Sequence, residues 1–250
     1  MLYSLGRLIL SGSIIEEFVV ELLIAEAVFC WKRPQREGFF RRCLFAVILL
    51  LAASFYWPYK QFSQEIPVRI QMLCILRYNA LFFLSVAGIM YCYSCGLNDA
   101  LFCGVGAYAM QHFAYCVIRS VCVPLEHANV SIGLVKYCLI AFLACTITYT
   151  LFYALFVRRI QREHIQVTRG ILLPALVVVV FTSSINLYAF NDTACKLCGI
   201  VICILTVWIL AGIFQNSKLE QELNAIRQLR SLKEEYYSVS RENIEAINMH

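Results

Sequence analysis

Charge is scarce in this sequence of 250 residues. Asp, Glu, Lys and Arg make up 15% of the chain, hydrophobic residues make up 61%, and the mean hydropathy is +0.71. Soluble domains carry about 25% charged and roughly 45–50% apolar residues. The shortage excludes an ordinary soluble domain and predicts a polytopic membrane protein. The net charge of +5 is small and comes from basic residues beside apolar runs, so we expect no nucleic-acid partner.

Sequence motifs of soluble enzymes and of nucleotide-binding or metal-binding sites are also missing. The sequence contains no Walker A loop, GxSxG or HExxH. Most of the thirteen cysteines lie inside apolar runs, where a free cysteine is a small hydrophobic residue. Two CxxC pairs, Cys92–Cys95 and Cys195–Cys198, fall on opposite predicted sides of the membrane and cannot share a metal ion. We therefore predict no metal site and no cofactor in this chain. The first residues lack a signal-peptide cleavage site, so we expect the N-terminus to be retained.

The apolar runs predict an all-α fold, a polytopic transmembrane helical bundle of about seven spans followed by a cytoplasmic amphipathic helix. A helix of roughly 20 apolar residues is long enough to cross a bilayer, and most of these runs are close to that length. The predicted spans are 8–31, 43–57, 72–95, 100–118, 133–157, 170–190 and 195–214. The second is short, and a re-entrant segment is the alternative. Residues 1–214 would form a transmembrane sensor domain and 215–250 a signalling and dimerisation helix.

Basic residues predict the orientation, because short cytoplasmic loops are enriched in Lys and Arg. The loop after the first span contains Lys32, Arg33, Arg36, Arg41 and Arg42. The loop after the fifth span contains Arg158, Arg159, Arg162 and Arg169. The opposite side is sparsely basic, with Arg7, Lys60, Arg69, Arg119 and Lys196. We therefore expect a multi-pass protein whose N-terminus lies outside and whose C-terminus lies in the cytoplasm.

Four polar residues inside the spans are candidates for sensing a signal: Glu21, Glu26, Arg77 and His112. A carboxylate in mid-bilayer costs about 2.5–3.5 kcal/mol or more, so it is usually functional or paired. Glu21 would make a polar contact inside the bundle, with Arg77 as one partner. The alternatives are that Arg77 snorkels to the outer surface and that His112 only joins two helices, rather than acting as a pH switch. A later start of the first span would place Glu16 and Glu17 at the outer interface.

The last sixth of the chain changes from an oily span to a charged segment without Gly or Pro. Its apolar residues follow a heptad spacing in two stretches, which comprise Leu219, Leu223 and Ile226 and then Leu229, Leu232, Tyr236 and Val239. The step of three from Ile226 to Leu229 interrupts the frame, as a stammer does in a coiled coil. The spacing predicts a dimeric helix. A single solvated helix is the alternative.

Three segments carry a resemblance to a known family. Residues 231–250, SLKEEYYSVSRENIEAINMH, resemble the helix before the phosphoacceptor box of GHKL-type bacterial sensor histidine kinases, which include receptors for peptide pheromones. ELLIAEAVFCWKRPQREGFFRR (21–42) is similar to the family's first helix and basic loop, and ALFCGVGAYAMQHFAY (100–115) to its central helix. In the family, a histidine beyond the stem takes phosphate from ATP bound by a following kinase domain. Aligned on Ile247-Asn248, His250 falls ahead of that box, so we do not assign it this role.

The resemblance implies a membrane sensor and dimerisation module of a two-component kinase in a bacterial cell membrane. Because no ATP-binding domain precedes His250, this polypeptide would not be a kinase alone. We expect a fragment of a longer enzyme, an engineered truncation or a degenerate membrane half. The implied partners are the lipid bilayer, a second copy, a cytoplasmic kinase domain, a response regulator, and a peptide or small-molecule signal. A small polytopic transporter and a scaffold that anchors a partner through its C-terminal helix are the alternatives.

Overall fold

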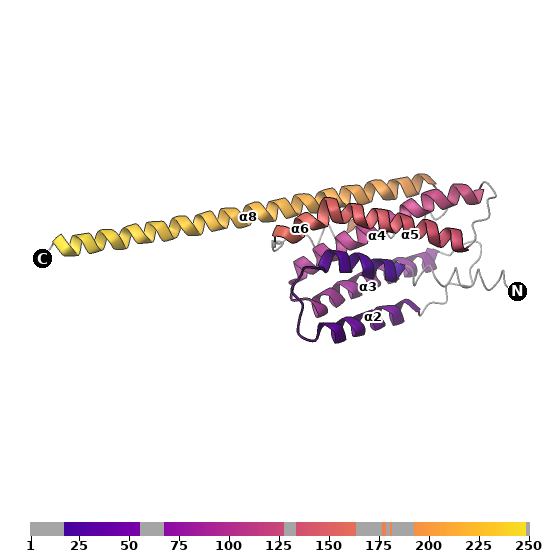
Figure 1. Cartoon of the computed structure of the whole chain (residues 1–250), viewed down its shortest axis with the longest axis horizontal. Helices are drawn as coiled ribbons and strands as arrows, with labels where there is room; N and C mark the ends of the chain where they lie inside the picture. Colours follow the sequence, from indigo (N-terminus) through magenta and orange to yellow (C-terminus); the bar gives the residue numbers. More distant parts are fainter. Residues whose placement is uncertain are drawn as a thin grey trace.

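The computed structural model describes residues 18–55, 68–127, 134–163, 177–178, 181 and 193–248. The elements in these ranges are helices (Figure 1). They are a helix over 18–30, α2 (Phe39–Phe55), α3 (Val68–Cys92), α4 (Leu97–His127), α5 (Leu134–Phe152), the π-helical turn η2 (Tyr153–Val157), α6 (Arg158–Glu163) and α8 (Thr193–Asn248). The predicted all-α class is confirmed.

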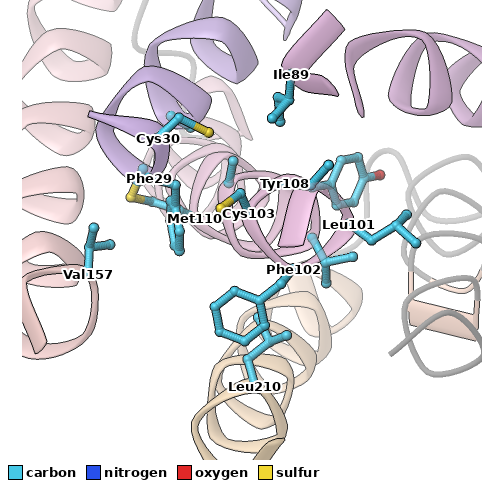
Figure 2. Close-up of a cluster of buried hydrophobic side chains, with 14 of the residues drawn as sticks. Phe29, Cys30, Ile89, Leu101, Phe102, Cys103, Tyr108, Met110, Val157 and Leu210 are labelled. Atoms are coloured by element: carbon cyan, nitrogen blue, oxygen red, sulfur yellow. The ribbon is translucent and has the colours of Figure 1, made fainter. Parts of the chain in front are cut away.

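Helix α4 lies at the centre of the bundle. Its side chains from Ala100 to His112 are buried, and it packs against α3, α5 and α8. Close-up views of this core show Phe102 of α4 lying against Leu210 of α8 (Figure 2). Gly106 permits the close approach of helix 18–30, because a Cβ there would lie 2.5 Å from Cε1 of Phe29. Small residues at such crossings allow the van der Waals packing that joins helices in lipid.

The outer helices expose their apolar side chains. Phe40 of α2, Val135 of α5 and Trp208 of α8 are 86%, 82% and 75% exposed. Exposed apolar surface of this extent is unfavourable in water and marks a surface that another apolar phase covers. Four helices contain stretches long and apolar enough to cross a membrane, namely Ile75–Cys92, Leu97–Cys122, Val135–Gln161 and Leu197–Arg241. The fold is that of a helical membrane protein with α4 inside.

These four stretches correspond to the predicted third, fourth, fifth and seventh spans. The first predicted span is described as a helix from residue 18, and the second as α2, which has 17 residues. Only residues 177, 178 and 181 of the predicted sixth span, 170–190, are described, so that span lies outside the described residues. The seven-span count therefore stays a prediction. The helix of the predicted seventh span continues beyond Phe214 into the charged segment, as predicted, and forms α8 to Asn248.

The basic segments gather at one end of the bundle. The loop 31–38, α6 and the point where α8 leaves the bundle all lie at the same end in Figure 1. The loop is attached to the end of α3 by two backbone hydrogen bonds, from Arg36 N to Cys92 O (3.0 Å) and from Ser94 N to Pro34 O (2.8 Å). Gly38 turns the chain into α2 with a φ of 71°, a conformation that favours glycine. This clustering agrees with the predicted shared side of both basic loops and the C-terminal helix.

Candidate functional site

Glu21 joins three helices in the middle of the bundle. Its Oε2 accepts a hydrogen bond from Nε2 of Gln111 in α4 at 2.9 Å, and the thiol of Cys145 in α5 lies 3.7 Å from Oε1. The hydroxyl of Tyr149 in α5 donates to the backbone carbonyl of Glu21 at 3.1 Å. We call these four residues the Glu21 node. Since each such interhelical bond contributes about 0.6 to 2 kcal/mol in a membrane, the node fixes helix 18–30 against α4 and α5.

Glu26 is a buried acid on a different face of the same helix. Its side chain is only 5% exposed and lies within hydrogen-bonding reach of Ser85 in α3. The Ser85 hydroxyl also donates to the carbonyl of Phe82 at 2.8 Å. Among the described residues, Oε1 of Glu26 has no hydrogen-bond partner. A buried carboxyl of this kind is costly, and a role of Glu26 in sensing a signal stays a prediction.

His112 lies at the contact between α4 and α8. It is 3% exposed, and its ring stacks with Tyr108 and Tyr115 at centroid distances of 5.9 and 6.0 Å. Its Nε2 lies 3.6 Å from Sγ of Cys116, and a Cβ on Gly199 of α8 would lie 3.7 Å from the same nitrogen. The position agrees with an interhelical contact. A role as a pH switch stays a prediction.

Arg77 contacts the end of a neighbouring helix. Its guanidinium donates a hydrogen bond to the backbone carbonyl of Ser54, in the last turn of α2. The last carbonyls of a helix have no partner within the helix, so this bond satisfies one of them. The bond joins α3 to α2, whereas the Glu21 contacts described above join helix 18–30 to α4 and α5. A pairing of Arg77 with Glu21 stays a prediction.

The basic end of the bundle is tied together by contacts that the sequence did not predict. Arg33 forms an ion pair with Asp99 in the first turn of α4 at 3.6 Å, and Nε of Arg36 donates to the carbonyl of Tyr93 at 3.0 Å. Gln161 of α6 donates to the carbonyl of Val28 at 2.9 Å. The basic loop is therefore docked on α3 and α4, in addition to carrying the charge that predicts topology.

Helix α8 belongs to the bundle with its first half and projects beyond it with its second half. Its first half packs against α4 through one face, which includes Cys203, Thr206, Leu210, Phe214 and Ser217. From Glu222 to Val239 all side chains are exposed, and Figure 1 shows this part projecting far beyond the bundle. The two heptad stretches that predict a dimer, which together form the predicted seam, are among the exposed residues. Leu219 is 56% exposed and Tyr236 is 71% exposed. A second chain could cover them, and the dimer itself stays a prediction.

The predicted sensing residues thus fall into three places. Glu21 bonds to Gln111, the residue before His112 in α4. Glu26 contacts α3, and Arg77 contacts α2. Gln111 and Tyr149 were not predicted to belong to this network. Gln111 could have been found as a polar residue in an apolar span, but nothing in the sequence distinguishes Tyr149 from other interfacial tyrosines.

No family model matches this chain, and comparisons with curated proteins and with solved structures found no match. In the part of the chain that the structure describes, no three His, Cys, Asp or Glu side chains lie together as a metal ion would require. The geometry therefore defines a class, a helical membrane protein with a buried polar network and one helix that extends well beyond the bundle.

Proposed function

We propose that this chain is the membrane sensor and dimerisation module of a two-component sensor histidine kinase. It would relay an extracellular or intramembrane signal to a cytoplasmic kinase domain. The observation that carries the proposal is the continuity of α8, which runs as one helix from Thr193 to Asn248. Its first half packs on the buried helix α4 and its second half is exposed. The resemblance of residues 231–250 to the stem of such kinases is the reason for proposing a histidine kinase domain as the receiver of the signal.

A continuous helix is a suitable element for carrying a signal out of the bundle. A helix cannot bend at an arbitrary point without losing backbone hydrogen bonds, so a displacement at its α4 contact reaches the exposed half. The signal must bind one arrangement of the bundle more tightly than the other, because only differential affinity shifts an equilibrium. The Glu21 node connects helix 18–30 to α4 and α5, so a ligand that alters it also alters the support of α8.

The break in the heptad frame supports two arrangements of the exposed helices. On a helix of 3.6 residues per turn, the stretch from Leu219 to Ile226 and the stretch from Leu229 to Val239 point to different sides. A two-helix seam that buries one stretch must twist to bury the other. Two packings of similar energy are what a two-state switch requires. In this proposal, seven spans cross the membrane with the basic end of the bundle in the cytoplasm.

A chimeric kinase tests the proposal. Residues 1–241 are joined in heptad phase to the catalytic half of a histidine kinase with a measurable output. Insertion of one residue after Gln228 turns the following helix by about 100° and is expected to change the output, whereas insertion of seven residues nearly restores the phase and serves as the control. Gln111→Leu, which removes a bond of the Glu21 node, is expected to shift the output, and Phe142→Leu on the exposed face of α5 is not.

Two results would contradict the proposal. One is an output that is the same for both insertions and for the chimera without the bundle. The other is solute flux through proteoliposomes that carry the unmodified chain, which would favour a transporter. Reading the gene beyond the codon for His250 is an independent check, since the proposal expects a phosphoacceptor box and an ATP-binding domain in frame.

A further inference from the structure

Helix α8 has a second face that the bundle does not cover. It starts from the predicted seam at Ile226 and continues toward the N-terminus in alternating steps of three and four. Its members are Ile226, Leu223, Leu219, Asn216, Gly212, Ile209 and Leu205, and all seven are exposed. On a helix of 3.6 residues per turn they lie within an arc of about 100°. The same register therefore runs unbroken from the apolar span into the charged segment.

This face points away from the bundle. The α8 residues that pack on α4, such as Thr206, Leu210 and Phe214, are 2–3% exposed, whereas Leu205 and Ile209 are 49% and 43% exposed. The centres of the two faces are separated by about 140° around the helix axis. A second helix can therefore pack along the exposed face while α4 stays in place.

We propose that a second copy of this chain packs in parallel along this face, so that one seam crosses from the bilayer into the cytoplasm. The inference rests on the proposed dimeric function and adds the part of the interface that lies in the membrane. Lipid can cover Leu205 and Ile209, but it cannot cover Leu223 and Ile226 beside the charged segment. Because both halves share one register, one occupant covers both, and copies inserted with the same topology are parallel.

Residues beside the seam are complementary to a second copy. In a parallel two-stranded coil, the residue at position g meets the residue at position e five places later in the partner. Taking Gly212 and Leu219 as d positions, Glu222 occupies g and Arg227 occupies e, and both side chains are exposed. Glu222 of each copy thus meets Arg227 of the other. The pairing has opposite charges in this register.

The seam also contains residues that suit a helix contact in a membrane. A Cβ added at Gly212 would meet nothing within 4 Å of its own chain, so a neighbouring backbone can approach closely there. Asn216 is a polar residue at a core position, where it fixes the register of a coiled coil at some cost in stability. The register ends after Ile226, because Arg230 and Lys233 would be the next core residues.

The test measures dimerisation of the full chain in proteoliposomes, by energy transfer between donor-labelled and acceptor-labelled copies over a range of protein-to-lipid ratios. Gly212→Leu fills the open space in the seam and should raise the dissociation constant of the dimer about tenfold or more. Ile204→Phe, which adds volume at an exposed position about 80° around the helix from Gly212, is the matched control and should leave the dimer unchanged.

Charge exchange tests the register independently. Glu222→Lys and Arg227→Glu should each weaken the dimer by about fivefold, because each creates like charges twice in the symmetric pair, and the double variant should restore it. If wild type is a dimer that neither Gly212→Leu nor the charge variants weaken, the seam is wrong while a dimeric sensor remains. If wild type is monomeric at all ratios, both the seam and the dimeric function are overturned.

Discussion

Gly199 provides the sharpest test of the contact between α4 and α8. A Cβ added there would lie 2.7 Å from Sγ of Cys116, whereas ordinary van der Waals contact begins at 3.4 Å. The overlap is therefore about 0.7 Å. Cys116 is fully buried beside His112, and the α4 backbone is held by α3 and α5 on its other sides. Neither helix can move apart without loosening the rest of the core.

The expected cost follows from two opposing effects of Gly199→Ala. Overpacking of a close-packed interior costs typically about 1–3 kcal/mol. Replacing glycine by alanine within a helix stabilises the folded state by roughly 0.5–1 kcal/mol. We therefore expect a net destabilisation of about 1–2 kcal/mol, which corresponds to a decrease in the unfolding midpoint of about 2–8 °C for a chain of this size.

The assay is thermal unfolding of the purified chain in detergent, with Gly88→Ala in α3 as the matched control. A Cβ on Gly88 would lie 3.6 Å from Cβ of Ala46, an ordinary van der Waals contact, so this variant should unfold at the wild-type temperature or slightly above it. Equal midpoints for Gly199→Ala and Gly88→Ala would refute the close contact between α4 and α8.

Three further substitutions test the polar contacts. Gln111→Leu removes the bond to Glu21 and should lower the unfolding free energy by about 1 kcal/mol, and an unchanged midpoint in detergent would show that the bond contributes nothing. Asp99→Asn weakens the partly buried ion pair with Arg33, so we expect a loss of about 1 kcal/mol at low salt that shrinks in 1 M NaCl; a loss independent of salt would argue against an ionic contact. Gln161→Leu removes a donor to the end of helix 18–30 and should cost about 1–2 kcal/mol, with Gln161→Asn, one methylene shorter, recovering less than half; full stability of the leucine variant would contradict the contact.

The helices themselves could be predicted because they depend on local composition. An apolar run of sufficient length forms a membrane helix whatever its neighbours are, and α3, α4, α5 and α8 follow this rule. The continuity of α8 was also predictable, because the charged segment after Gln215-Asn216-Ser217 contains no Gly or Pro. The structure carries the helix through these residues.

The partners of each helix could not be predicted, because a span that is apolar on all sides does not show which side faces protein. Glu21 was expected to make a polar contact, but whether Arg77, Gln111 or another residue would meet it depends on helix rotation. The same limitation applies to Gly106 and Gly199, whose neighbours become visible only when the helices are placed together. Charge predicted the shared end of the basic loops but not the bond from Arg36 to Tyr93.

The continuity of α8 through Gln215-Asn216-Ser217 is the claim on which both proposals depend, and hydrogen exchange of the chain in nanodiscs tests it directly. The amides from Gln215 to Gln221 are compared with those of the exposed segment that follows. Slow exchange is expected through this junction, because every amide remains bonded within one helix. Rapid exchange confined to the junction would reveal a flexible joint, across which neither a rotation nor a shift of α8 could pass.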